Sequence, residues 1–115
     1  MKRLLALLLS CALLLPLAWG APVEGVVPFV EAHCYECHGD GMDKGGLDFD
    51  VLGRDLTDPA TSATWEEIFD RVQRREMPPS KATRQPSDEE RARMAAVLGP
   101  ALAQGNCSGL KRWFV

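Results

Sequence analysis

The stretch that decides the fold is Cys34-Tyr35-Glu36-Cys37-His38. Two cysteines separated by two residues, with a histidine directly after the second, form the pattern through which haem is attached to a chain. Each thiol adds to one vinyl group of the porphyrin, and the adjacent histidine is directed beneath the iron. The sequence therefore predicts one covalent haem c, held by Cys34 and Cys37, with His38 as the proximal iron ligand.

Two other uses of paired cysteines fit this chain less well. A redox-active dithiol is expected inside a βαβ pattern, and no strand-rich pattern surrounds the pair. A structural zinc site needs four ligands, and outside the pentapeptide only His33 and the distant Cys107 are offered. Without Cys11 of the leader described below, three cysteines remain, an odd number that does not suit a disulfide framework.

The first twenty residues have the pattern of a secretory signal peptide. Lys2 and Arg3 precede an apolar run over 4–15, and the small residues Ala18 and Gly20 mark a cleavage site before Ala21. A membrane span needs roughly 20 apolar residues, and Pro16 interrupts this run. We expect residues 1–20 to be cleaved, with export to the periplasm or otherwise out of the cytoplasm; retention as an uncleaved anchor is the alternative. No stable membrane span is expected after cleavage.

The rest of the chain has the size and composition of one small domain. Of 115 residues, 46% are hydrophobic and 25% are charged. We place the domain at 21–105 and a C-terminal tail at 106–115. Beyond residue 20 the chain holds 11 basic and 16 acidic residues, a net charge of −5. This balance argues against a nucleic-acid partner and favours neutral or cationic ones.

Three helices are predicted, joined by a long loop, so the fold class is all-α. The first runs from about Val26 to Cys34, with a proline near its start. The second begins at the capping box of Thr64 and ends before Pro78, and the third begins after Ser87 and ends near Gly105. The stretch 39–59 is rich in Gly and Asp and is predicted to be loop. Its adjacent glycines at 45 and 46 predict either a plain turn or backbone of positive φ near the haem edge.

The sixth iron ligand has four candidates, Met42, Met77, Met94 and His33. Met42 follows His38 too closely to cross the porphyrin. His33 is predicted to be a solvated helix residue, and Met94 lies on the apolar stripe of the third helix, where methionine usually fills a core. Met77 follows a helix, precedes two prolines and lies 39 residues after the proximal histidine. It is the predicted ligand, since a Met/His pair is the ligation of cytochromes c.

With these residues identified, the chain resembles the planctomycete-type cytochrome c domain, a class I-like module, over roughly 29–98. Five segments carry the resemblance: Cys34-Tyr35-Glu36-Cys37-His38-Gly39, Lys44-Gly45-Gly46-Leu47-Asp48, Trp65 with Ile68 and Arg71-Val72, Glu76-Met77-Pro78-Pro79, and Pro86-Ser87-Asp88-Glu89-Glu90-Arg91. It implies a small cytochrome c-like fold around one haem, with His38 and Met77 as the axial pair. This chain departs from the pattern at 95–98, where relatives often carry a Trp-Ile pair. Larger domains commonly follow the module in relatives, so whether the redox partner is a fused domain or a separate protein stays open.

The expected function is single-electron transfer outside the cytoplasm, without catalysis, to a redox partner of unknown identity. A haem-based sensor or a structural module of an exported assembly is the alternative. A peroxidase-type enzyme fits less well, because it needs an open sixth position and a distal acid-base group, and His33 is the sole histidine besides His38. In the tail, Cys107 is expected to be a buried free thiol or an intermolecular disulfide, and Trp113 with Phe114 either an anchor or a docking patch.

Overall fold

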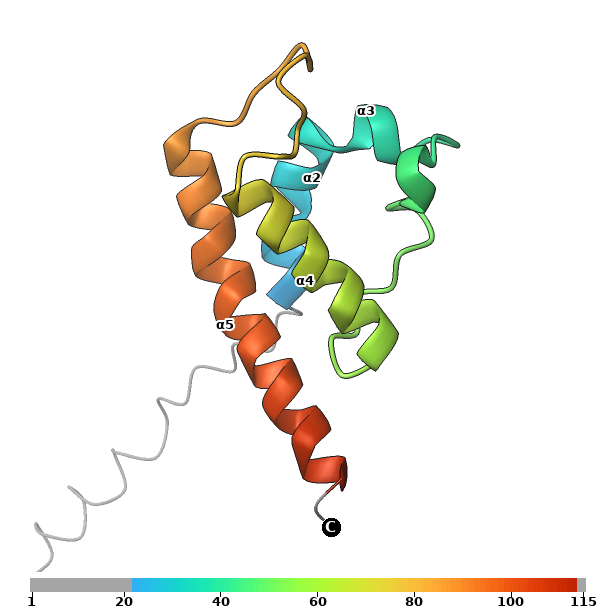
Figure 1. The fold of residues 1–115 in the computed structure, drawn as a ribbon, viewed down its shortest axis with the longest axis vertical. Coiled ribbons are helices and arrows are strands. Elements are labelled where there is room, and N and C mark those ends of the chain that lie inside the picture. Colours follow the sequence, from blue (N-terminus) through green and yellow to red (C-terminus); the bar gives the residue numbers. More distant parts are fainter. Residues whose placement is uncertain (1–21, 114–115) are drawn as a thin grey trace, which may run out of the picture.

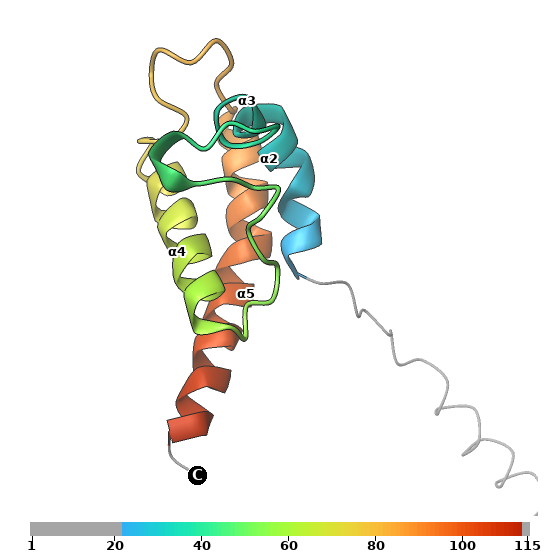
Figure 2. The same cartoon turned by 90° about the vertical axis from the view of Figure 1, so that its right-hand side faces the viewer.

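The computed structural model describes residues 22–113, and this part of the chain is helical without a strand. Its elements in order are η1 (Pro22–Val26), α2 (Val27–His33), α3 (Tyr35–His38), η2 (Lys44–Gly46), α4 (Pro59–Gln73) and α5 (Asp88–Trp113), as Figures 1 and 2 show. The all-α prediction is confirmed. The predicted signal peptide lies outside the described residues, as do the side chains of the predicted tail.

The first predicted helix is divided into shorter pieces. A 3-10 turn precedes α2, which has Pro28 in its first turn, where a missing N–H leaves no bond unmade. The chain bends at Cys34 and resumes as the single turn α3. The described residues therefore contain four α-helices, because the haem-attachment pentapeptide forms a helical turn of its own.

The second helix begins at Pro59, so the predicted start at Thr64 is wrong. Asp58 caps the true start, where its side chain accepts a hydrogen bond of 2.8 Å from the backbone N–H of Thr61. The hydroxyl of Thr64 instead donates back to the carbonyl of Ala60 inside the helix, at 3.1 Å. The helix ends at Gln73, as expected before the two prolines.

The third helix begins as predicted and ends later than predicted. Its capping box is complete, since the N–H of Ser87 donates to the Glu90 carboxylate at 2.8 Å and the N–H of Glu90 donates to the Ser87 hydroxyl at 3.1 Å. The predicted end near Gly105 is wrong, because α5 continues to Trp113. A glycine inside a helix lowers helix stability by only about 1 kcal/mol relative to alanine. No proline follows Gly105 to stop the helix.

The core forms where α5 packs against both α4 and η1. Helix α4 contributes Trp65, Ile68 and Val72, with Phe69 half-buried at the side. On the apolar stripe of α5, where Met94 was predicted, Val97 is 37% exposed and the other four residues are buried: Met94, Leu98, Ala101 and Leu102. The buried hydrophobic residues of the described part are Val23, Val26, Phe29, Val30, Leu56, Trp65, Ile68, Val72, Met94, Leu98, Ala101 and Leu102.

His33 links α2 to α5 and is not the solvated residue that the sequence predicted. Its side chain is 1% exposed, its Nε2 lies 3.2 Å from Oε1 of Glu90, and its ring packs against Phe29 with centroids 5.0 Å apart. The sequence pattern placed His33 at the end of a helix without showing that a carboxylate from a helix 57 residues away meets it there.

The Glu90 carboxylate should contribute stability that depends on acid pH. Hydrogen bonds from the N–H of Ser87 and from His33 lower its pKa from 4.5 to about 2. The folded protein thus holds the charged form more firmly than the unfolded chain, so this contribution is complete above about pH 4.5 and is lost as pH falls toward 2. The Glu90→Gln holoprotein should melt at a lower temperature than wild type above about pH 4.5, and this difference in melting temperature should shrink as the pH falls toward 2. Circular dichroism follows the melting. A difference equal at all pH values would contradict the assignment.

Candidate haem site

The His38 imidazole is oriented for metal binding through one of its two nitrogens. Its Nδ1 lies 3.2 Å from the carbonyl oxygen of Leu47. A carbonyl only accepts, so Nδ1 carries the proton and donates, and the lone pair of the neutral ring lies on Nε2. A backbone carbonyl that fixes the tautomer in this way is the usual support of a metal-bound histidine. Nε2 is therefore the ring nitrogen of His38 that is left free to bind a metal.

The loop after the pentapeptide brings the Leu47 carbonyl to His38. Within η2, Gly45 and Gly46 have φ of 67° and 78°, in the left-handed region that side chains disfavour. Of the two alternatives for this turn, the structure shows backbone of positive φ. Directly after it, the N–H of Phe49 donates to the carbonyl of His38 at 2.7 Å, and the Phe49 ring meets the imidazole edge-on with centroids 6.3 Å apart. The loop thus holds His38 by its backbone and by its ring.

The pentapeptide is also tied to this loop through Tyr35. The Tyr35 hydroxyl donates to the Asp50 carboxylate, whose other oxygen accepts from the N–H of Asp40 at 2.8 Å. The Tyr35 ring lies so close to Gly39 that a Cβ there would be 2.3 Å from Cε2. Glycine at this position therefore lets the ring cover the backbone directly after His38.

The two cysteines are free thiols on one helical turn. The carbonyl of Cys34 accepts from the N–H groups of Cys37 and His38 at 3.2 and 3.1 Å. Residues three apart on such a turn share a face, so the two thiols lie on the same side of it. Burial raises the pKa of the Cys34 thiol to about 12, and the Lys44 ammonium lies 3.8 Å from Sγ of Cys37.

The three candidate methionines have different environments. Met42 is 44% exposed, and Met94 is 3% exposed inside the core, which confirms its predicted role as core filling. Met77 is half-buried and packs against the core from its border. Of the three, Met77 alone is partly covered and partly accessible, as a sulfur ligand beside an inserted group needs to be.

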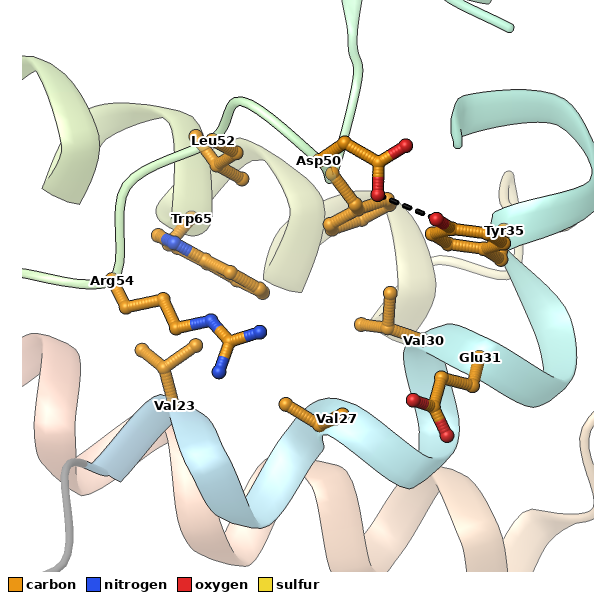
Figure 3. Close-up of a pocket in the computed structure, with 10 residues that line it drawn as sticks. Val23, Val27, Val30, Glu31, Tyr35, Asp50, Leu52, Arg54 and Trp65 are labelled. Atoms are coloured by element: carbon orange, nitrogen blue, oxygen red, sulfur yellow. Dashed lines mark hydrogen bonds between the residues drawn. The ribbon is translucent and has the colours of Figure 1, made fainter. Parts of the chain in front are cut away.

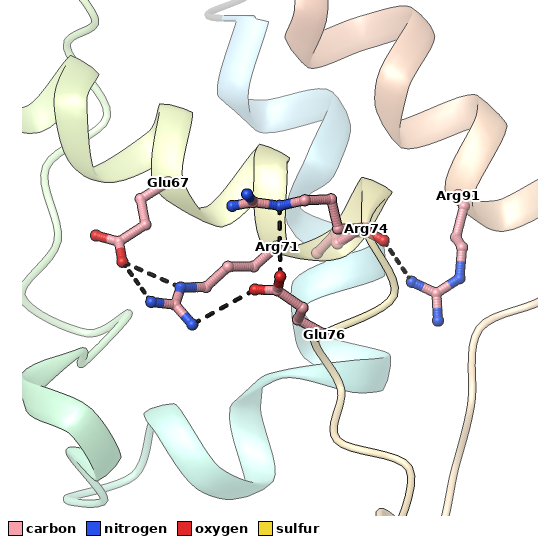
Figure 4. Close-up of polar contacts among 6 residues, drawn as sticks. Glu67, Arg71, Arg74, Glu76 and Arg91 are labelled. Atoms are coloured by element: carbon pink, nitrogen blue, oxygen red, sulfur yellow. Dashed lines mark hydrogen bonds and ion pairs between the residues drawn. The ribbon is translucent and has the colours of Figure 1, made fainter.

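Arg91 holds the Met77 segment from α5, a role that the sequence did not predict. It is 7% exposed, and its Nη1 donates to the carbonyl of Val72 at 2.7 Å and to the carbonyl of Met77 at 3.2 Å; the first bond is drawn in Figure 4. A signal for it exists in the sequence. Arg91 precedes Met94 and Leu98 by three and seven residues, so it occupies an apolar-stripe position where a charge needs specific partners.

A cavity of about 450 Å³ lies beside this site. Figure 3 shows its walls, with Val23, Val27 and Val30 on the N-terminal helical segment and Trp65 and Arg54 opposite. It touches the pentapeptide only at Tyr35, and the other lining residues are Glu31, Phe49, Asp50 and Leu52. Neither cysteine, nor His38, nor Met77 lines it, so the candidate haem site is defined by its donor atoms and not by this cavity.

A small helical domain with two thiols on one turn, followed by a histidine whose Nε2 is free to bind metal, has the features of a c-type cytochrome. Residues 34–81 match the family model described as Planctomycete cytochrome C. This match supports the planctomycete-type cytochrome c domain that the sequence predicted. No curated protein and no solved structure matches the chain.

The family match spans the haem-attachment pentapeptide and the double-proline segment. A cytochrome c domain implies haem c, and the residues present fit that group: two free thiols three residues apart and an imidazole with a fixed tautomer. Cys34 and Cys37 would hold the porphyrin and His38 the iron. Among residues 22–113, no helix is both long and apolar enough to cross a membrane.

Proposed function

We propose that this protein is an exported cytochrome that carries single electrons on one covalent haem c. The observation that carries the proposal is the hydrogen bond from Nδ1 of His38 to the Leu47 carbonyl, beside two free thiols. When bound, haem supplies an iron that cycles between the ferric and ferrous states. The chain's part is to hold the ligands in place and to exclude water while the charge on the iron changes.

We assign the sixth ligand position to Met77. The half-buried side chain packs against the core, and both polar groups of its backbone are hydrogen-bonded. The N–H of Met77 donates to the Arg71 carbonyl at 3.2 Å, and its carbonyl accepts from Arg91. A thioether ligand favours ferrous iron and raises the reduction potential, and firm anchoring of its backbone keeps the position closed.

A peroxidase-type activity is disfavoured by the placement of His33. Its Nε2 bonds to Glu90 and its ring is buried against Phe29, so it is not free to move protons at a distal site. Together with the anchored Met77 segment, this supports electron transfer without bond-making chemistry, and it leaves no histidine outside the pentapeptide for acid-base catalysis at the iron.

Reduced-minus-oxidised spectra recorded with and without carbon monoxide test this function. A closed site with two protein ligands should give sharp bands of a low-spin haem and should not change when the gas is added. A gas sensor or an enzyme with an open position should bind carbon monoxide within the mixing time. Rapid, complete binding by the wild-type holoprotein would therefore exclude the electron-carrier assignment.

A further inference from the structure

Charge is divided unevenly between the two segments that flank the candidate haem site. Residues 31–58, which include the pentapeptide and its loop, contain eight acidic and two basic residues. Residues 71–86, which include Met77, contain five basic residues and one acidic residue. A chain of net negative charge thus has one locally positive segment. All five basic side chains are exposed, and we call them the basic surface: Arg71, Arg74, Arg75, Lys81 and Arg84.

The basic surface belongs to the end of the molecule that presents the haem-attachment turn. In both Figures 1 and 2 the loop between α4 and α5 projects beyond the ends of these helices, and α3 lies at the same end. The loop carries Lys81 and Arg84, and it begins with the segment that holds Met77. A partner that meets this end therefore approaches the side of the site where Met77 lies.

Part of the positive charge is neutralised within the surface, and part is not. Arg71 pairs with Glu67 at 2.9 Å, and Glu76 lies between Arg71 and Arg74, at 3.7 and 3.5 Å (Figure 4). Arg75 pairs with Asp88 at 2.6 Å. Lys81 and Arg84 form no ion pair with any described residue, so their charges are available to a partner.

We propose that the basic surface is the docking site for a redox protein whose contact surface is acidic. This rests on the proposed function, since one electron would pass between the iron and the partner's redox centre with no bond made or broken. The net charge of −5 over residues 21–115 favours neutral or cationic partners. A partner within contact distance nevertheless feels the nearest charges, because the Debye length is about 10 Å at 0.1 M salt. Lys81 and Arg84 are the charges it would meet first.

Charge complementarity favours a protein over an anionic membrane as the occupant. A protein's acidic patch can be small enough to cover Lys81 and Arg84 without covering the acidic side chains of 31–58. An extended anionic bilayer meets the acidic segments as well, and it repels residues 21–115, whose net charge is −5. Polyglutamate serves as the probe for an acidic protein surface, and phosphatidylglycerol vesicles serve as the probe for a membrane.

Electron exchange with small charged reagents measures the potential at this surface in the holoprotein. Ferrous haem gives one electron to hexacyanoferrate(III), a trianion, or to tris(phenanthroline)cobalt(III), a trication, and each reagent is reduced by that electron. At about 0.01 M salt, Lys81→Glu and Arg84→Glu should each slow the reaction with the anion about three- to tenfold and speed the reaction with the cation. At about 1 M salt the differences should vanish.

Arg93→Glu is the matched control, with the same change of net charge. Arg93 is exposed, and it lies two residues from Arg91, so it faces away from the side of α5 that contacts Met77. The Arg93→Glu substitution should change the rate of the reaction with hexacyanoferrate(III) less than twofold. An equal effect of all three variants, or a wild-type anion rate that rises with salt, would show that net charge governs approach and would overturn the proposal.

Binding provides a readout apart from electron exchange. Polyglutamate should shift the amide resonances of residues 74–86 in the ferrous holoprotein, and Lys81→Glu combined with Arg84→Glu should abolish these shifts. Tighter binding to phosphatidylglycerol vesicles than to polyglutamate would overturn the proposal in favour of a membrane. If the holoprotein exchanges electrons with neither reagent, both the proposed function and the docking of a redox protein are refuted. If exchange is rapid but does not depend on the charge of the reagent, only the docking site is refuted.

Discussion

The doubly substituted protein Cys34→Ala/Cys37→Ala should retain no covalent haem after export, and each single substitution should reduce the yield. Both thiols lie on one helical turn beside a histidine whose tautomer is already set. In the proposed site, each would supply one of two links to the same porphyrin. Haem staining of a denaturing gel measures the result. Because the denaturant removes haem that is held only by ligation, staining of the double variant would contradict covalent attachment through these residues.

Cys107→Ala provides the control for this experiment, because it removes a thiol outside the pentapeptide. It should stain as strongly as wild type. The double variant should also lose most of its far-ultraviolet helical signal, since a chain of this length has a small core and binding of haem to the folded form adds to its stability. A cooperative, native-like melt of the haem-free double variant would show that the helices are stable without the cofactor.

The candidate haem-binding residues could be proposed from the sequence because the chemistry expected of them depends on local spacing. Cys34, Cys37 and His38 lie within five residues, and a single helical turn is enough to bring them together. The positive φ of Gly45 and Gly46 was predictable for the same reason, since adjacent glycines indicate backbone that other residues avoid. The Leu47 carbonyl that this turn presents to His38 was not, because any residue has a carbonyl.

Helix boundaries were predicted well where one capping signal stood alone and poorly where two competed. Ser87 was the only strong signal at its helix start, and its capping box formed. At the second helix Asp58 with Pro59 and Thr64 with Glu67 both fit a start, and the earlier one prevailed because it adds a turn that extends α4. The contacts of Arg91 and His33 were missed because each depends on a partner from another element.

Met77→Ala should abolish the weak near-infrared band that arises from sulfur-to-iron charge transfer in the ferric holoprotein, and should lower the reduction potential by on the order of 0.1 V or more. The reason is that Met77 is half-buried against the core and its backbone is held in place. Its N–H donates to the Arg71 carbonyl, and its carbonyl accepts from the Arg91 side chain. No other methionine can therefore replace it without moving this segment. Spectra and redox titration of the same sample measure both effects.

Met42→Ala and Met94→Ala are the matched controls, because each removes the same thioether from a different environment. Met42 is exposed, so its loss should leave both band and potential unchanged. Met94 is 3% exposed in the core, so Met94→Ala should leave a cavity that lowers the free energy of unfolding by about 2–5 kcal/mol. Its melting temperature should fall, while the near-infrared band persists. If the band survives in Met77→Ala and disappears in either control, the sixth ligand comes from the loop after His38 or from α5, and the double-proline segment does not supply it.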